Sequence, residues 1–285
     1  MEDVELDPIS TAQKEESALR TFFKVRFFLF HGIFIAATVF VAPTQQTILA
    51  GVALYFIRMF GVTAGYHRYF SHRTYKTSRF VAFCLAFLAQ SSAQRGVIWW
   101  ASNHRHHHRF SDKPQDLHSP VQQGLFFSHV GWLWDPSSYQ KRNNISDLER
   151  CPELRWLNQH PMFPAIVLGV SCWLVLGWAG LVYSFGISTI VLFHATFTIN
   201  SLSHVWGKKV YDTNDDSRNN IWLALLTLGE GWHNNHHHYM RSTRQGFDWW
   251  QIDITYYILY LLNKIGIVWN LRPVPEQVRK DKKKQ

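Results

Sequence analysis

The chain has 285 residues, of which 47% are hydrophobic, 16% aromatic and 17% charged, and it carries a net charge of +9. This apolar, aromatic composition argues against nucleic acid as a partner and favours an anionic membrane surface or an acidic protein. The three cysteines form no C-x-x-C pair, which argues against a disulfide framework or a zinc–thiolate site and fits a reducing compartment.

Residues 1–20 are predicted to form a disordered acidic tail. The first 18 residues contain six acids but only one base, Lys14, so the rest of the chain is more basic than the net charge suggests. A polar, acidic start of this kind is not a secretory signal, and its composition favours disorder.

The first apolar region predicts two membrane-spanning helices. No charged residue occurs between Phe27 and Ile57, and the polar stretch "APTQQ" around Pro43 interrupts this run. A spanning helix needs about 20 apolar residues. We therefore expect spans near residues 25–42 and 47–66, joined by a turn.

The sequence "HRYFSH" follows the second predicted span and contains His67 and His72. Residues five apart do not share a face of a straight α-helix. We expect both side chains to turn inward because the helix unwinds at the end of the span. The apolar stretch 80–94 that comes next is too short to cross a membrane and is expected to lie at the interface or on the cytoplasmic domain.

The sequence "HRHHH" predicts a helix that carries metal ligands. His104, His107 and His108 have the spacing i, i+3, i+4, so they share one helical face, whereas His106 falls on the opposite side. A flexible basic loop is the alternative, but the same spacing recurs further along the chain.

A second charge-free run covers residues 162–203 and has "GWAGLVYSFG" near its centre. Its length fits two spans, near residues 164–183 and 185–203, with a tight turn between them. Asn200 and His204, at i and i+4, share a face at the end of the last span.

The third histidine sequence, "HNNHHH", repeats the H-x-x-H-H spacing. His233, His236 and His237 share a helical face, and His238 lies well off it. The apolar stretch 254–263 is again too short to span and is expected to be an interfacial or packed helix.

Orientation follows from the basic residues. Lys24 and Arg26 precede the first span, the 67–161 segment is rich in arginine and lysine, and the chain ends "RKDKKKQ". The positive-inside rule places all these segments, both termini and the histidines in the cytoplasm. We expect a single domain over residues 21–272, whose cytoplasmic cap comprises residues 67–161 and 204–272, followed by a basic tail at 273–285.

The histidine groups are therefore expected to converge at the cytoplasmic edge of the membrane. About nine imidazoles are too many for one metal ion, so two ions are predicted. Imidazole binds iron, zinc, copper and nickel alike, so the residues alone do not name the metal.

At this point the chain resembles the membrane fatty-acyl desaturases, in particular the Δ9, stearoyl-type branch. The resemblance covers about residues 25–272. It is carried by H-x-x-x-x-H and two H-x-x-H-H sequences between hydrophobic hairpins, and by "GVTAGYHRYFSHRTYK", "HRFSDKPQDLHSP", "FFSHVGWLW", "NSLSHVWG", "DDSRNNIWLALLTLGEGWHNNHH" and "WWQIDITYY". It implies an all-α integral membrane protein in which four transmembrane helices, arranged as two hairpins, carry a cytoplasmic helical cap that holds a di-iron histidine site.

The resemblance also assigns residues. Its iron ligands fall on His67, His72, His104, His107, His108, His204, His233, His236 and His237. Asn200 would act on one of the two iron ions through a water molecule. Gln94, Trp100 and Thr196 lie where the acyl tunnel of the family bends, although each fits an ordinary core position equally well. His118 and His129 are expected to support the site or the fold rather than bind iron.

The implied reaction removes two hydrogens from a saturated acyl chain with O2 and leaves a cis double bond. No H-P-G-G haem motif occurs, so the two electrons would come from a separate ferredoxin, rubredoxin or cytochrome b5-type protein. In the animal acyl-CoA enzymes an Arg–Asp pair helps to hold CoA, and Ser102 and Asn103 replace it here. The basic residues expected after "HVGW" are also replaced, by "LWDPSSY", so the acyl carrier, CoA or lipid, stays open.

Two other functions fit parts of the pattern. A di-iron membrane hydroxylase of the alkane or carotenoid type would use similar histidines but insert oxygen. A metal transporter or sensor would need ionisable residues along several spans. The predicted spans contain His31, His194 and Arg58, and Arg58 is expected to extend its charge to the membrane surface.

Overall fold

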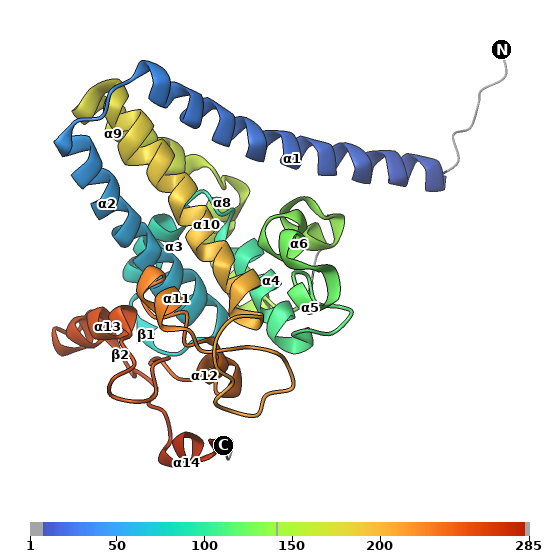
Figure 1. Ribbon diagram of the computed structural model, residues 1–285, viewed down its shortest axis with the longest axis vertical. Helices are drawn as coiled ribbons and strands as arrows, with labels where there is room; N and C mark the ends of the chain where they lie inside the picture. The colour runs from blue at the N-terminus through green and yellow to red at the C-terminus, as the bar shows by residue number, and fades with distance from the viewer. Residues whose placement is uncertain (1–7, 141, 283–285) are drawn as a thin grey trace.

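The computed structural model describes residues 8–140 and 142–282 and is mostly helical (Figure 1). Within this described part, three helical stretches are long and apolar enough to cross a membrane: Glu16–Phe40, Gln45–Ser71 and Phe163–His204. Figure 1 shows α2, α9 and α10 running together, while α1 diverges from them, and the histidine helices α4 and α12 lie at one end of this group.

Helix α1 spans Pro8–Phe40, so residues 8–20 are helical where a disordered tail was expected. Residues 1–7 of that expected tail lie outside the described residues. Proline at the first helical position suits a helix start, because its fixed φ is helical and its missing N–H would have no partner there. The helix ends before Pro43, where the polar turn was predicted.

Helix α2, Gln45–Phe60, begins with a reciprocal cap. The Thr44 hydroxyl accepts a hydrogen bond from the Thr47 N–H at 3.2 Å, and the Thr47 hydroxyl accepts one from the Thr44 N–H at 3.0 Å. The helix runs without a break into a π-helix, η1, Gly61–Ser71. This π-helix carries the first histidine pair out of the apolar region.

The apolar run that follows Phe163 is a hairpin. It comprises α9 (Phe163–Ala179), the π-helix η4 (Gly180–Ile187), α10 (Ser188–Ser201) and the 3-10 turn η5 (Leu202–His204). The chain reverses at Gly177, whose φ of 65° and ψ of −158° suit glycine. After this reversal Gly169 lies against the Phe185 ring. The reversal lies at the first residue of "GWAGLVYSFG", so the third span ends earlier than the predicted residue 183, because length alone cannot show which glycine adopts the positive φ.

Arg58 does not extend to the membrane surface as predicted. Its side chain is fully buried between α2 and α10. The guanidinium donates to the Thr189 hydroxyl at 2.6 Å, to the Ser188 hydroxyl at 2.7 Å and to the Leu54 carbonyl at 3.1 Å. The two apolar hairpins are thus joined by a buried cation that donates a hydrogen bond from each of its three nitrogens, as a buried polar group requires partners.

The remaining elements are short and build the end of the molecule that holds the histidines. They are β1 (Lys76–Thr77), α3 (Arg79–Gln90), α4 (Val97–Phe110), α5 (Pro120–Gln123), α6 (Leu125–His129), η2 (Gly131–Trp134), η3 (Pro136–Tyr139), α7 (Ser146–Glu149), α8 (Pro152–Gln159), α11 (Ile221–Leu226), α12 (His233–His238), α13 (Ile254–Lys264), β2 (Val268–Trp269) and α14 (Glu276–Lys280). Strands β1 and β2 pair antiparallel. This pairing ties the segment after η1 to the C-terminal part of the chain.

The two short apolar stretches form helices α3 and α13, close to the predicted bounds. Helix α3 packs against η1, where Gly61 and Gly65 allow close backbone approach to Ala89 and Leu85. Helix α13 buries Leu259 but leaves aromatic and apolar side chains exposed on its other side. Helix α3 therefore belongs to the main core, and α13 covers its edge.

Candidate metal centre

Helices α4 and α12 present their histidines as the spacing predicted. His106 points away from the site, and its Nε2 atom lies 2.9 Å from the Gln115 carbonyl oxygen. His238 also leaves the site and stacks on the Tyr211 ring, with 4.3 Å between the ring centroids. The remaining histidines of both helices face inward.

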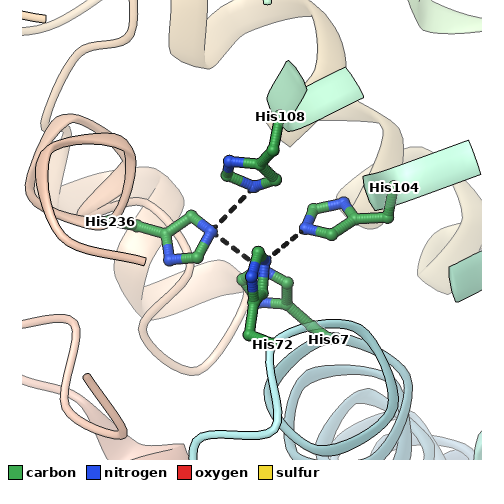
Figure 2. Close-up of side chains that lie close together, drawn as sticks. All are labelled: His67, His72, His104, His108 and His236. Atoms are coloured by element: carbon green, nitrogen blue, oxygen red, sulfur yellow. Dashed lines mark hydrogen bonds between the residues drawn. The ribbon is translucent and has the colours of Figure 1, made fainter. Parts of the chain in front are cut away.

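Five of the inward-facing rings form one group, which we call the five-histidine cluster (Figure 2). Its members are His67, His72, His104, His108 and His236. The Nε2 atom of His236 lies 3.0 Å from that of His67 and 3.0 Å from that of His108. The Nε2 atoms of His72 and His104 are 2.8 Å apart. Five ring nitrogens from three separate elements therefore converge on one point.

The other four predicted ligands form a second group, the four-histidine cluster. Its members are His107, His204, His233 and His237. The Nε2 atoms of His204 and His233 are 3.1 Å apart. The Nε2 atoms of His107 and His237 are buried and form no hydrogen bond with the described part of the chain. Buried nitrogens of this kind need a partner, and a metal ion would supply one.

His67 and His72 share a face for a reason that differs from the prediction. The chain does not unwind between them. It forms the π-helix η1, and the His72 N–H donates to the His67 carbonyl at 3.2 Å. A π-helical turn aligns residues i and i+5, so the five-residue spacing suits the local geometry.

Arg105 holds α4 against the end of η1. Its guanidinium donates to the carbonyls of Phe70 and Ser71, at 2.6 and 3.1 Å, and pairs with Asp147 at 2.7 Å. This arginine lies between His104 and His106 in the sequence but points away from both clusters. It therefore fixes the distance between His72 and His104.

Four carboxylates support the clusters, and the sequence analysis did not identify them. Each lies against the Nδ1 atom of one histidine: Glu230 and His67 at 2.5 Å, Asp116 and His107 at 2.9 Å, Asp112 and His204 at 2.8 Å, and Asp215 and His237 at 2.6 Å. Such contacts fix the ring orientation and leave Nε2 free for a metal. The sequence did contain an indication of these carboxylates, because Asp112 and Asp116 closely follow the second histidine sequence in a chain with few acidic residues.

The carboxylates stay ionised despite their burial. Burial alone would raise the pKa of Glu230, but the adjacent His67 ring and the Arg68 guanidinium lower the pKa to about 2. Burial likewise opposes ionisation of Asp112, whereas the hydrogen bond from His204 brings the pKa of Asp112 to about 2. The site thus contains negative charge that would offset the charge of bound cations.

Several of the rings are held neutral, whereas the pKa of His107 is raised, because the charge of Asp116 outweighs the effect of burial. Burial, and then the proximity of other histidines, lowers the pKa of His104, His108 and His236 well below the usual value. For His237, burial outweighs the charge of Asp215 and lowers the pKa to about 4. Neutral imidazoles expose the lone pair that a metal needs. The all-imidazole donors, the free Nε2 atoms and the nearby carboxylates together fit two metal ions.

A cavity of about 380 Å³ opens beside the clusters. It is lined by His104, by Asn200 and by all three side chains predicted to contact substrate, Gln94, Trp100 and Thr196. The Gln94 amide donates to the Thr196 hydroxyl at 3.1 Å. Trp100 stacks on His104, with 4.9 Å between centroids. The apolar walls of this cavity therefore lead directly to a histidine of the five-histidine cluster.

His118 and His129 differ in their distance from the clusters. His118 lies beside His107, with 4.4 Å between ring centroids, and close to Asp116. His129 lies elsewhere, and its ring nitrogens contact the Ser201 hydroxyl and His194, each at 3.0 Å. The first is placed to support a ligand ring, and the second joins α6 to α10.

Residues 43–262 match the family model described as fatty acid desaturase. Palmitoyl-monogalactosyldiacylglycerol delta-7 desaturase of Arabidopsis thaliana is 35% identical over 249 residues, which cover 85% of this chain and 67% of the relative. Icosanoyl-CoA 5-desaturase of Limnanthes douglasii is 37% identical over 79% of this chain and 64% of its own length. Delta-9 acyl-lipid desaturase 1 of Arabidopsis thaliana is 35% identical over 88% of this chain and 84% of its own length. These names differ in double-bond position and in acyl carrier.

Proposed function

Because the chain belongs to the fatty acid desaturase family, and so is an oxidoreductase acting on fatty acyl chains, we propose that it forms a cis double bond in a saturated acyl chain. The double bond is introduced at Δ9. The reaction uses O2 and two electrons from a separate protein, and the carrier of the acyl chain is CoA or a lipid. The observation that carries this proposal is the apolar cavity that ends at the five-histidine cluster.

Two iron ions are the proposed cofactor, one in each histidine cluster. When bound, they supply the O2-activating redox chemistry that no side chain can provide. The nine histidines hold them, and Asn200, one helical turn before His204, acts on one of them through water. The four carboxylates keep the Nδ1 protons of His67, His107, His204 and His237 in place, so that the Nε2 lone pairs of these four rings face inward.

The cavity residues position the substrate. Two sp3 carbons offer no polar handle, so the shape of the cavity must decide which bond is oxidised. Trp100 packs between Tyr66 and His104 and forms the wall next to the five-histidine cluster. The Gln94–Thr196 hydrogen bond closes another side of the cavity. These contacts support the proposal that the acyl chain bends here.

The electron donor is proposed to be an acidic protein of the ferredoxin, rubredoxin or cytochrome b5 type. Arg109 and Lys113 are exposed and directly follow the histidines of α4, and Lys208 is exposed shortly after His204. Basic side chains around the clusters would steer an acidic donor to them.

We also propose that the chain crosses the membrane four times, with both termini and the metal site in the cytoplasm. The reversal at Gly177 supports this count, because it divides the run after Phe163 into two antiparallel helices. A green fluorescent protein fused to the C-terminus is expected to fluoresce, since the fusion folds on the cytoplasmic side. A dark, fully translocated fusion would contradict the orientation.

The reaction is tested by the fatty-acid profile of a bacterial host that expresses the chain in air with a compatible electron donor. We expect a new cis-Δ9 monoene, located by mass spectrometry, in cells with the wild-type chain and not with His236→Ala. A hydroxylated product would replace this proposal by the hydroxylase function. An unchanged fatty-acid profile in cells whose expressed protein contains iron would contradict the proposal that the substrate is an acyl chain.

A further inference from the structure

Two arginines line the cavity at the side formed by α1 and the loop before α4. Arg95 and Arg26 both belong to its wall, together with Phe23 and Trp99. No carboxylate among the residues that the structure describes forms an ion pair with either arginine. Arg95 is partly buried, and a partly buried cation beside a second, exposed cation at one apolar cavity is costly without an anion, so this placement needs an explanation.

Arg95 is held in a cage of three aromatic rings. Its guanidinium carbon lies 3.8 Å from the Phe23 ring centroid, 4.4 Å from that of Tyr139 and 5.2 Å from that of Trp99. The side chain also donates a hydrogen bond to the Tyr139 hydroxyl. A guanidinium has five N–H donors. The cage therefore fixes the cation while leaving most of its donors for another group.

The backbone at this position is also constrained. Ala93 and Arg95 have φ values of 58° and 69°, a region that non-glycine residues rarely adopt. The Tyr66 hydroxyl donates to the Arg95 carbonyl at 2.6 Å and so holds the loop in place. Strain of this kind persists where the surroundings enforce it, and it is concentrated at binding sites.

The electrostatics point to a negatively charged ligand. Burial, and then the positive charge of Arg26, lowers the pKa of Arg95 to about 9. The negative charge of an anion placed between the two arginines would offset both effects, and arginine binds phosphate through paired hydrogen bonds.

The residues at the positions where the animal enzymes hold CoA, Ser102 and Asn103, are not available to bind an anionic ligand. Asn103 is buried, donates to the Trp99 and Ser138 carbonyls and accepts from Arg142 at 2.9 Å. Ser102 bonds with Asn144 at 3.0 Å. Both side chains are therefore engaged within the chain.

We propose that Arg95 and Arg26 bind a phosphate of the acyl carrier at the entrance of the cavity. This proposal rests on the proposed function for the identity of the apolar chain that enters the cavity. It selects a phosphate-bearing carrier, a phospholipid or CoA, over an uncharged one such as a glycolipid. The phosphate docks on Arg95 while the acyl chain extends past Gln94 and Trp100 toward the clusters.

The test compares two ligands that share an apolar chain, hexadecyl phosphate and hexadecanol, by direct binding of the radiolabelled compounds to the full chain in detergent. We expect the wild type to prefer the phosphate by about tenfold or more, as for a charge-assisted pair. Arg95→Gln should lose this preference while its affinity for hexadecanol is kept. Arg150→Gln, which removes an exposed arginine outside the cavity, should behave as wild type.

Equal affinities in the wild type, or a preference retained in Arg95→Gln, would overturn the proposal. If Arg95→Gln bound neither ligand because the aromatic cage had collapsed, the Arg26→Gln variant would test the phosphate site instead. Arg26 is exposed, so its loss should lower the phosphate preference without damage to the cavity, and an unchanged preference would count against the site.

Competition distinguishes the two sources of phosphate. Phosphatidylglycerol and palmitoyl-CoA are each titrated against bound hexadecyl phosphate. The stronger competitor identifies the carrier, and displacement by neither one contradicts the proposal. A chain that prefers the phosphate but makes no unsaturated product in cells would reject the desaturase function and leave the phosphate site standing.

Discussion

The two histidine clusters hold their rings in different ways. In the four-histidine cluster, His107, His204 and His237 each have a carboxylate against Nδ1. In the five-histidine cluster, His67 is the one ring with such a contact among the described residues. The first cluster relies on buried negative charge, whereas the second adds a fifth imidazole and relies on the packing of α4 against η1.

This difference has consequences for metal binding. A carboxylate on Nδ1 makes the ring a stronger ligand and offsets the charge of the cation. Removing one of these carboxylates should therefore weaken metal binding in the four-histidine cluster more than removing a distant carboxylate would. The five-histidine cluster has less negative charge to lose, but its single carboxylate, Glu230, also neutralises the buried Arg68. Its loss should therefore affect folding as well as metal binding.

The largest effect is expected from a ligand of the five-histidine cluster. His236→Ala removes the ring that contacts both His67 and His108, and activity should fall by more than about 100-fold, beyond the loss typical of a supporting residue. The fatty-acid profile of expressing cells measures this loss. His238→Ala is the control, because that ring stacks on Tyr211 and should leave activity unchanged. Full activity in His236→Ala, with the protein present in membranes, would contradict the assignment.

Glu230→Gln should destabilise the protein by about 3 kcal/mol, because it removes a partner from a buried cation. Arg68 keeps its contact with Asp253 at 2.9 Å, so the fold should survive. Thermal unfolding of the detergent-solubilised chain measures the change. Asp248→Asn breaks an ion pair between Asp248 and a half-exposed Lys282 and should cost less than about 1 kcal/mol. Equal losses in the two variants would mean that Glu230 has no special role.

Asp215→Asn should lower metal affinity in the four-histidine cluster by about 10- to 100-fold. The Asp215 carboxylate lies 2.6 Å from the His237 Nδ1 atom. After a wash with a chelator, metal analysis should show about one iron per chain in the variant and two in the wild type. Glu153→Gln, which removes a carboxylate paired with Arg79 on the surface, is the control. Two irons retained in Asp215→Asn would show that the carboxylates do not support binding.

A further effect is a dependence of stability on pH in the chelator-treated protein. Burial lowers the pKa of His104, His108 and His236 in the folded state, whereas the unfolded chain takes up protons below about pH 6.5. Stability should therefore be constant above pH 7 and fall below about pH 6.5, by up to about 1.4 kcal/mol per pH unit for each ring. The temperature midpoint of thermal unfolding, recorded at a series of pH values, measures this fall in stability.

The carboxylates should add to this loss only at lower pH. The pKa of Glu230 is about 2 in the folded state, below its usual value of 4.5, so its contribution is present above about pH 4.5 and lost as the pH falls toward 2. A midpoint that rises as the pH falls from 7 to 5 would contradict the lowered pKa values of the histidines.

The sequence by itself determined which histidines share a helical face. The i, i+3, i+4 spacing on α4 and α12 fixes which rings point together, because side-chain direction in a helix follows from the 3.6-residue turn. The same local rule explains why His106 and His238 point away from the clusters. The family also followed from the sequence, since it is carried by residues in fixed order and spacing.

The tertiary structure decided what depends on contacts between distant residues. The five-residue spacing of His67 and His72 required a π-helix, which no local spacing rule for an α-helix predicts. The supporting carboxylates and the cage around Arg95 join segments far apart in the chain, and Arg58 is buried because Ser188 and Thr189 lie beside it. Helical periodicity is a local property, whereas the burial and pairing of charges depend on which surfaces meet, so only the folded chain reveals them.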